Sequence, residues 1–285
     1  MSYNLIERIN DDVSRALTED IGTGDLTALL VSAQQQSAAQ VVSKESAVLC
    51  GTAWFDCCFK AVSPESEIRW LVKDGDAVTA QQKLCEVSGN ARALLTAERS
   101  ALNFLQMLSA VATQTRTYVD AIAGTSAKIV DTRKTLPGLR LAQKYAVKCG
   151  GGFNHRIGLY DGILIKENHI AAAGGIAEVL KQARSIAPKD VFIQIEVESI
   201  SQLRTALDAG AVMILLDNFT VNQLEEAVAV SRDYRHKSDQ RILLEASGNI
   251  DLDNVRRIAE TGVDRISIGG LTKNIQAIDL SMRFV

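Results

Sequence analysis

The sequence predicts an α/β protein with two regions of different pattern. The first observation is the capacity for a large core, since the chain of 285 residues is 47% hydrophobic. The second is a repeat over residues 126–285, where a short apolar strand is followed by an amphipathic helix. Such βαβ units require a parallel sheet or a barrel. The third is that residues 1–110 lack this repeat and combine helices with short strand-like pieces. These observations predict an N-terminal α/β domain followed by a series of βα units.

The N-terminal region is expected to open with a helix over residues 5–17, where apolar residues recur at helical spacing. The turn-forming stretch EDIGTGDLT follows. Four strand-like pieces come next, namely QVVSK, AVLCG, EIRWLVK and KLCEVSG. Asp74-Gly75-Asp76 predicts a hairpin turn between two of these pieces. From Ala91 to about residue 115 apolar residues return on one face, which predicts a long helix.

The C-terminal region contains six expected strands: AKIVD, GILIK, VFIQIEV, VMILLD, RILLEAS and DRISIGG. Helices are expected over 172–186, 199–209, 220–235 and 251–260. Six strands do not establish a closed eight-stranded barrel, so a partial barrel is an equal alternative. The change of pattern near residues 110–115 gives the expected domains 1–112 and 113–285. The last helix of the chain is expected to pack back on the N-terminal domain.

Charge and cysteine usage exclude several classes of protein. A net charge of -3 argues against a nucleic-acid or membrane surface as partner. The N-terminus MSYNLIERINDD lacks the pattern of a signal peptide, and no apolar run approaches the length of a membrane span. The five cysteines form no CxxC pair and no other metal-ligand spacing. We therefore expect reduced thiols in a cytoplasmic enzyme.

Polar residues follow each expected strand of the C-terminal region, at positions where an apolar core would not select them. In chain order they are Asp131-Thr132-Arg133-Lys134, Lys166-Glu167-Asn168, Glu196 with Glu198, Asp217-Asn218, Glu245-Ala246-Ser247-Gly248-Asn249, and Gly269-Gly270. In α/β barrels the C-terminal ends of the strands form the active site. One polar strand end is common, but six along the same rim favour a catalytic site.

Cations are concentrated between residues 131 and 169, where seven lysines and arginines stand against three acids. Four of them, together with His155, lie in three short clusters, Arg133-Lys134, His155-Arg156 and Lys166, which are separated by apolar or glycine-rich sequence. A solvated basic tail would be contiguous. The spacing therefore indicates a folded pocket for a small, multiply charged anion.

The strand ends separate by charge into three expected subsites. The early strands bring the cations, which suit a carboxylate-bearing anion. The middle strands bring Glu196 and Asp217, which can hold Mg²⁺ and hydroxyl groups. The last two strands lead into glycine-rich turns whose backbone amides can bind phosphate. A phosphoribosyl pyrophosphate donor and an anionic acceptor would use all three subsites.

Long motifs in this order resemble those of one family. They are EDIGTGDLT, LVKDGDAV, LLTAERSALNFLQMLSAVAT, DTRKTLPGLR, KYAVKCGGGFNHRIGLYDGILIKENH, IEVES, ILLDNF, EASGNI and ISIGGLT. From about residue 17 to residue 283 the chain resembles the quinolinate phosphoribosyltransferases, the carboxylating nicotinate-nucleotide pyrophosphorylases. The resemblance implies an N-terminal α/β sandwich-like domain, a C-terminal open (incomplete) α/β barrel and a homodimer. It also implies Mg²⁺ and the conversion of quinolinate and phosphoribosyl pyrophosphate into nicotinate mononucleotide, pyrophosphate and CO2, a step of NAD biosynthesis.

The resemblance also implies roles for individual residues. Substrate-binding residues are expected to be Arg99, Thr132, Arg133, Lys134, His155, Arg156, Lys166, Ser247, Gly248, Asn249, Gly269 and Gly270. Lys134, Glu196 and Asp217 are expected to be catalytic, and the two acids are expected to hold the metal directly or through water. Arg99 is expected to enter the partner subunit's site. Asn249 stands where some members carry glycine, so its side chain narrows the expected phosphate loop. The motif register favours Glu196 over Glu198.

Other interpretations of the same residues stay open. A barrel lyase could use Lys166 as a Schiff-base amine, which must be neutral to react. A relative from the molybdenum-locus pyrophosphorylase group, or an anion-binding protein without catalysis, would share part of the pattern. Arg99 could equally be a solvated helix residue, and Lys144 and Lys148 could complement a helix C-terminus. His169 could be a loop histidine with its hydrogen bonds satisfied.

Overall fold

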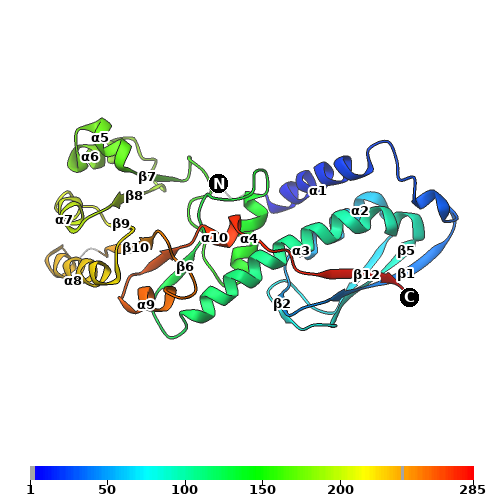
Figure 1. The fold of residues 1–285 in the computed structure, drawn as a ribbon. Helices are drawn as coiled ribbons and strands as arrows, with labels where there is room; N and C mark the ends of the chain where they lie inside the picture. Colours follow the sequence, from blue (N-terminus) through cyan, green and yellow to red (C-terminus); the bar gives the residue numbers. More distant parts are fainter. Residues whose placement is uncertain (1–3, 239–240) are drawn as a thin grey trace. The chain divides into compact units, whose positions relative to one another are not determined.

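The computed structural model describes residues 4–238 and 241–285, and the side chains of residues 235–238 are not described (Figure 1). The chain folds into two compact units. One unit comprises Met1–Arg116, Thr135–Gly151 and Gly270–Val285, and the other comprises Thr117–Lys134 and Gly152–Gly269. The boundary expected between residues 112 and 113 stays a prediction.

The first unit contains an antiparallel sheet in the order β12-β1-β5-β3. Its strands are β1 (Gln36–Ser43), β3 (Glu67–Trp70), β5 (Lys83–Asn90) and β12 (Leu280–Phe284). The short strands β2 (Ala47–Val48) and β4 (Ala77–Val78) pair in a second sheet. The expected hairpin at Asp74-Gly75-Asp76 is wrong, because this turn leads from β3 to β4 while β3 pairs with β5. At the end of the chain the last helix, α10 (Gly270–Lys273), and the strand β12 both belong to the first unit, where α10 contacts α4 and β12 pairs with β1.

Helices of the first unit include α1 (Leu5–Ile21), η1 (Ala28–Leu30), α2 (Thr52–Val62), the long α3 (Ala91–Ala121), α4 (Arg140–Cys149) and α10 (Gly270–Lys273). The core collects aromatic side chains of α2, since Phe55 and Phe59 have ring centroids 4.8 Å apart and are fully buried. Helix α2 begins where Asp74 Oδ1 accepts hydrogen bonds from the backbone N–H groups of Gly51 and Thr52. These bonds satisfy donors that have no partner within the helix.

The second unit is built on a parallel sheet, which has six strands among the described residues in the order β6-β11-β10-β9-β8-β7. The strands are β6 (Lys128–Val130), β7 (Gly162–Ile165), β8 (Phe192–Val197), β9 (Met213–Asp217), β10 (Leu243–Ser247) and β11 (Arg265–Ser267). The sheet is open, with β6 and β7 at its edges. This arrangement confirms the expected fold class, an incomplete α/β barrel together with an N-terminal α/β domain.

Helices follow the strands of the second unit in sequence. They are α5 (Glu167–Ala173), α6 (Ile176–Ile186), α7 (Ile200–Asp208), α8 (Val221–Ser238) and α9 (Val255–Glu260). Consecutive helices contact one another along the sheet, as Figure 1 shows for α6, α7 and α8. The helix expected over 172–186 is divided into α5 and α6, because Gly174 and Gly175 both adopt positive φ. None of the described helices is long and apolar enough to cross a membrane.

Candidate active site

The C-terminal ends of the six parallel strands lie along one edge of the sheet. Because neighbouring strands run in the same direction, the residues that follow them meet at this edge. Asp131 follows β6, Lys166 follows β7, Glu196 lies near the end of β8, and Asp217 and Ser247 end β9 and β10. Most of the polar strand ends expected from the sequence are thus neighbours in this unit.

Lys166 and Glu196 form an ion pair at this edge. Lys166 Nζ lies 2.8 Å from Glu196 Oε2. The lysine side chain is 47% exposed, whereas the glutamate side chain is only 8% exposed. The carboxylate is therefore buried against the sheet, whereas the ammonium group remains accessible to an anion. Glu198 is exposed beyond the end of β8, so Glu196 is the acid of this pair that belongs to the rim.

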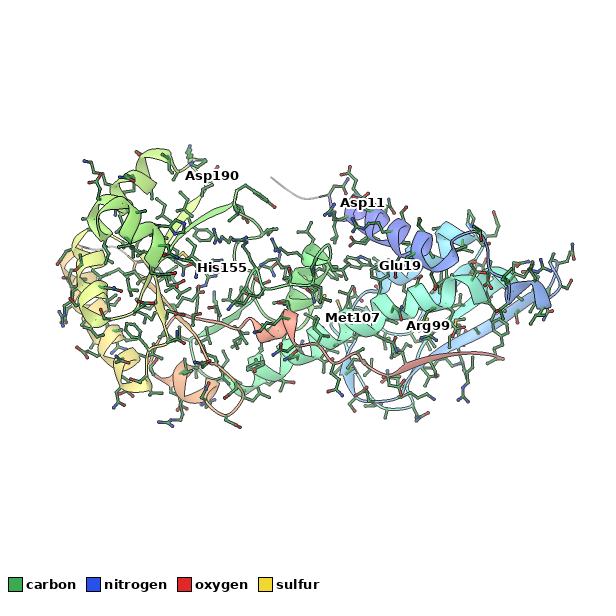
Figure 2. All side chains as sticks on the ribbon, turned by 45° about the horizontal axis from the view of Figure 1, so that its top comes forward. Asp11, Glu19, Arg99, Met107, His155 and Asp190 are labelled. Carbon is green, nitrogen blue, oxygen red and sulfur yellow. The ribbon has the colours of Figure 1, made fainter. Side chains whose placement is uncertain are left out.

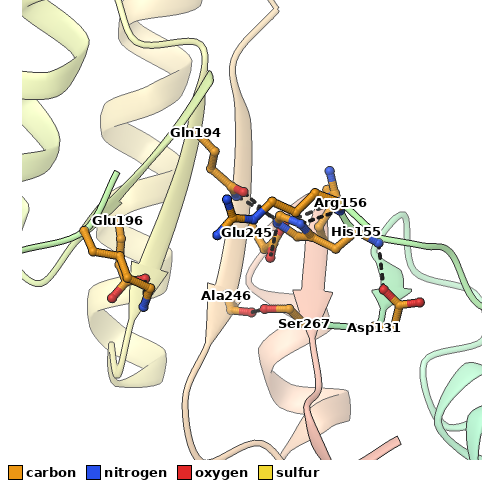
Figure 3. A network of polar contacts seen from close by, with 10 residues as sticks. Asp131, His155, Arg156, Gln194, Glu196, Glu245, Ala246 and Ser267 are labelled. Atoms are coloured by element: carbon orange, nitrogen blue, oxygen red, sulfur yellow. Dashed lines mark hydrogen bonds and ion pairs between the residues drawn. The ribbon is translucent and has the colours of Figure 1, made fainter. Parts of the chain in front are cut away.

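His155 is fixed in position and in tautomer (Figure 3). Its backbone N–H donates to Asp131 Oδ1 at 2.8 Å, and Asp131 is fully buried. The backbone N–H of Arg156 donates to His155 Nδ1 at 2.7 Å. Since a peptide N–H can only donate, Nδ1 accepts, and the ring hydrogen of the neutral imidazole lies on Nε2. Nε2 then donates to Gln194 Oε1 at 2.8 Å.

A buried polar chain continues behind His155. Gln194 Nε2 donates to Glu245 Oε2 at 3.2 Å, and Arg265 Nε lies 3.2 Å from the same oxygen. Glu245 Oε1 is 3.7 Å from His155 Nε2. Gln194 and Glu245 are at most 1% exposed, so each needs its partners to offset the loss of hydration. Side chains from three strands, β8, β10 and β11, thereby form the buried chain that braces this imidazole (Figure 3).

Two arginines concentrate positive charge beside this imidazole. Burial and the nearby charge of Arg133 lower the pKa of Arg156, while Asp161 acts in the opposite direction. Arg156 is anchored by its NH1 group, which donates to the carbonyl of Gly162 at 2.9 Å. Asp161 accepts the backbone N–H groups of Ile157 and Gly158 and so holds the loop that carries Arg156. Like charges held this close favour the binding of an anion between them.

Thr132, Lys134 and Gly269 lie together at the β6 and β11 side of the rim. The backbone N–H of Lys134 donates to Thr132 Oγ1 at 3.0 Å. A Cβ atom on Gly269 would lie 3.0 Å from Lys134 Cδ and 3.6 Å from Thr132 Oγ1. The glycine therefore leaves room for the lysine stem to lie against the backbone of the turn.

The turn after β10 packs closely against the turn after β9 and is hydrogen-bonded to it. Gly248 and Asn249 both adopt positive φ, and so does Asn218. The backbone N–H of Asn218 donates to the carbonyl of Ser247 at 2.9 Å, and its side-chain amide donates to Asp217 Oδ2 at 2.8 Å. A Cβ atom on Gly248 would lie 2.1 Å from Asn218 Oδ1. This compact turn leaves Asp217 half-buried at the end of β9.

Comparisons with known proteins identify the family. Residues 25–109 match the family description "Quinolinate phosphoribosyl transferase, N-terminal domain", and residues 111–283 match its C-terminal domain. The chain belongs to the quinolinate phosphoribosyl transferase family. The resemblance expected from the motifs is confirmed.

Relatives within the family are similar over nearly the whole chain. A probable nicotinate-nucleotide pyrophosphorylase (carboxylating) of Bacillus subtilis is 42% identical over 264 residues, covering 93% of this chain and 89% of the relative. A chloroplastic enzyme of the same name from Arabidopsis thaliana is 39% identical, covering 95% of this chain and 81% of the relative. The structure of nicotinate-nucleotide pyrophosphorylase from Francisella tularensis superposes with a TM-score of 0.93 at 44% identity, covering 98% and 97% of the two chains.

Not every expected site residue lies in the unit that carries the rim. Arg99 belongs to the first unit and is exposed on α3, and Gly270, which begins α10, is grouped with the same unit. His169 Nδ1 accepts the backbone N–H of Lys166, which satisfies it at the start of α5. Lys148 is exposed in the last turn of α4 and can complement the end of the helix dipole.

Sequence reasoning does not assign roles to Asp131, Gln194 and Arg265 in holding His155. The pattern marks Gln194 only as a polar residue on β8, and Asp131 only as a strand end. Glu245 could be expected to partner a rim cation, and the structure places it beside His155 and Arg265. The available signal was the two-residue period, which puts Gln194 and Glu196 on one face of the same strand.

Proposed function

We propose that this chain transfers the phosphoribosyl group of phosphoribosyl pyrophosphate to quinolinate and releases CO2. The products are nicotinate mononucleotide and pyrophosphate, and the reaction is a step of NAD biosynthesis. The observation that carries the proposal is the clustering of positive charge at Arg133 and Arg156, together with the Lys166–Glu196 ion pair at the ends of β7 and β8. Membership of the family and the names of its relatives support the same reaction.

Quinolinate is the acceptor that fits the cations. It carries two carboxylates on a planar ring, and planar guanidinium groups bind carboxylates through two parallel hydrogen bonds. Arg133 and Arg156 are therefore assigned to the carboxylates, with Lys166 as a point charge. His155 presents its ring beside them in a fixed tautomer. Binding of the dianion also relieves the repulsion between the two arginines.

The donor phosphates are assigned to the two glycine-containing turns. Backbone N–H groups at such turns can point toward a phosphate. Ser247, Gly248 and Asn249 form the turn after β10, and Gly269 follows β11 beside Lys134. Lys134 and Thr132 can then add a charge and a hydroxyl group to the backbone donors. Gly270 is assigned to the same phosphate subsite on the family pattern.

The acids Glu196 and Asp217 fit a Mg²⁺ site. They lie near the ends of neighbouring strands, offer only oxygen donors, and are held in place by Lys166 and Asn218. Mg²⁺ favours carboxylate oxygens together with substrate phosphates and water. When bound, the cation would neutralise charge on the leaving pyrophosphate. The two carboxylates themselves would stabilise the positive charge that develops at ribose C1.

Bond changes then follow from the way the substrates are held. The C1–O bond of the donor breaks with its electrons on pyrophosphate, and the ring nitrogen of quinolinate bonds to C1. The resulting pyridinium accepts the electron pair left at C2 when the C2–carboxylate bond breaks and CO2 leaves. C2 then takes a proton. The loss of CO2 removes no proton and needs no dedicated base, and the proton that C2 takes up comes from solvent. The arginines and Lys166 therefore act mainly by orienting the carboxylates.

A homodimer with a shared site is part of the proposal. Arg99 is exposed on α3 and can reach a second molecule. Beside it, α1 and α3 border a cavity of about 370 Å³ whose lining includes Glu19, Asn103 and Met107. Figure 2 labels Glu19 on α1, and Met107 and Arg99 on α3. We assign Arg99 to the partner subunit's substrates. The five free cysteines suit a reducing compartment, so we place the enzyme in the cytoplasm.

The rival lyase function is less compatible with Lys166. A Schiff base requires a neutral amine. Glu196 lies 2.8 Å from Lys166 Nζ, and this carboxylate stabilises the ammonium form. Borohydride treatment with a carbonyl substrate should therefore trap no adduct on this lysine.

A product assay tests the proposal. Purified protein is incubated with carboxyl-labelled quinolinate, phosphoribosyl pyrophosphate and Mg²⁺, and all products are quantified. Nicotinate mononucleotide, pyrophosphate and CO2 should appear in equal amounts. Lys166→Ala should abolish turnover, whereas Lys181→Ala, an exposed lysine on α6, should not change it. Absence of CO2 under all tested metals and pH values would refute the assignment, as would full activity of Lys166→Ala.

A further inference from the structure

Two distant cysteines and an aspartate converge in the first unit. Cys50 precedes α2, Asp74 lies in the turn before β4, and Cys149 is the last residue of α4. One ligand atom from each, the two sulfurs and a carboxylate oxygen, lie within 4.8 Å of one another. Within the ranges that the structure describes, no other group of three histidine, cysteine or acidic side chains converges in this way. None of the three residues takes part in the proposed transfer reaction.

Asp74 is oriented by hydrogen bonds from two elements. Its Oδ1 accepts the backbone N–H groups of Gly51 and Thr52 at 3.0 and 3.1 Å, and its Oδ2 accepts the hydroxyl of Tyr145 at 2.8 Å. Carboxylates that ligate metals in proteins are typically oriented by such outer hydrogen bonds. The carboxylate is thus held in place before any ligand binds.

The two cysteines are equally well held. The backbone N–H of Cys50 donates to Ser109 Oγ on α3 at 2.9 Å, and the cysteine is fully buried. Cys149 ends α4, and the next residue, Gly150, packs so closely on α3 that a Cβ atom would lie 2.5 Å from the carbonyl of Ala112. The backbone at Cys50 and the backbone next to Cys149 are therefore held against the same helix, and Cys149 is partly accessible to solvent.

We propose that Cys50, Asp74 and Cys149 form a binding site for a thiophilic divalent cation of the Zn²⁺ class. Two thiolates and one carboxylate are a ligand set that Zn²⁺ accepts, with the fourth tetrahedral position left to water. Zinc bonds of about 2.3 Å to sulfur and about 2.0–2.2 Å to oxygen place ligand atoms roughly 3.5–3.8 Å apart. Since the three atoms already lie within 4.8 Å, side-chain movements of about 1 Å close the site.

The hydrogen bonding of the thiols is consistent with this chemistry. The hydrogen bond from Cys50 is the main factor that lowers the pKa of Cys149, whereas burial raises the pKa of Cys50. The soft sulfur donors distinguish this site from the oxygen-only pair Glu196 and Asp217, which suits Mg²⁺.

Metal titration of the reduced full-length chain tests the proposal. Zn²⁺ is added in competition with a chromophoric chelator, and Cd²⁺ is used separately because thiolate–Cd²⁺ bonds give a charge-transfer absorption. We expect about one equivalent bound per chain, with the Cd²⁺ absorption of thiolate ligation. Cys50→Ser and Cys149→Ser should each weaken binding by at least about 100-fold. Cys57→Ser is the matched control, since Cys57 faces Asn10 outside the group and should not affect binding.

Four results would overturn the proposal. One is the absence of tight Zn²⁺ or Cd²⁺ binding by the reduced protein. Another is unchanged affinity in both serine variants, checked by circular dichroism to be folded. The third is a Cys50–Cys149 disulfide in protein that binds no metal after reduction, which would make the pair a redox couple instead. Asp74→Asn keeps the acceptor for Gly51 and Thr52, so a folded Asp74→Asn variant that binds like the wild type would also contradict the ligand set.

Discussion

The turn after β10 gives a sharp prediction for Gly248→Ala. Two costs are expected. Positive φ at a non-glycine residue costs about 1–2 kcal/mol, and Gly248 has φ 98°. In addition, the new Cβ would lie 2.1 Å from Asn218 Oδ1 and 3.0 Å from the Asn218 backbone nitrogen. Asn218 must then move, which strains its hydrogen bonds to Ser247 and Asp217, each worth about 0.5–1.5 kcal/mol. We expect a total loss of about 2–5 kcal/mol.

Gly174→Ala provides the matched control for this prediction. Gly174 has a similar φ of 87°, but a Cβ atom there would meet nothing within 4 Å. It should therefore show the backbone cost alone, about 1–2 kcal/mol. Urea unfolding of both variants measures the difference. Steady-state kinetics should also show a raised KM for phosphoribosyl pyrophosphate in Gly248→Ala only. Equal destabilisation of the two variants, with unchanged donor KM, would refute the reasoning that the two turns are interlocked.

Three further predictions concern other parts of the molecule. Gln194→Leu removes the hydrogen-bonded bridge between His155 and Glu245. It should lower the free energy of unfolding by about 1–3 kcal/mol and reduce kcat/KM. Wild-type values in denaturant unfolding and in kinetics would contradict the claim that Gln194 holds His155 in place. Arg69 and Lys83 lower the pKa of Glu86 to about 2. A carboxylate whose pKa is lower in the folded state stabilises that state at pH values above its unfolded pKa of about 4.3. This contribution to the free energy of unfolding is lost as the pH falls toward 2. An NMR titration should show the Glu86 pKa rising in Arg69→Ala, and an unchanged value would refute this coupling. Mixing Arg99→Ala chains with Lys166→Ala chains should restore part of the activity if sites are shared across a dimer. Confirmed heterodimers without activity would show that Arg99 does not act in the partner's site.

The sequence predicted the parallel sheet well because each strand is an apolar run that ends in polar residues. VMILLD and RILLEAS, for example, became β9 and β10 with shifts of at most two residues at their starts. The rim followed from the same pattern, because parallel strands bring their C-terminal ends to one edge. Lys166 and Glu196 are 30 residues apart in the chain, yet their contact follows from their positions on neighbouring strands.

Other features depend on contacts that a sequence pattern does not encode. Helix α2 was not predicted, because TAWFDCCFKAV is aromatic-rich and follows a strand-like apolar run. Its start is set by the side chain of Asp74, which lies 22 residues away from Thr52 in the chain. The hairpin expected at Asp74 failed because β5, and not β4, pairs with β3. The convergence of Cys50 with Cys149 arises from the packing of α2 and α4 around α3, so no local spacing could indicate it.

The central claim is that cations from separate strand ends bind one dianionic acceptor, and calorimetric titration of quinolinate tests it most directly. Arg133→Ala and Arg156→Ala should each weaken binding by about 10- to 100-fold, the loss expected for charged hydrogen bonds of about 1.5–3 kcal/mol. Lys181→Ala should bind quinolinate as the wild type does. Unchanged quinolinate affinity in both arginine variants would contradict the account.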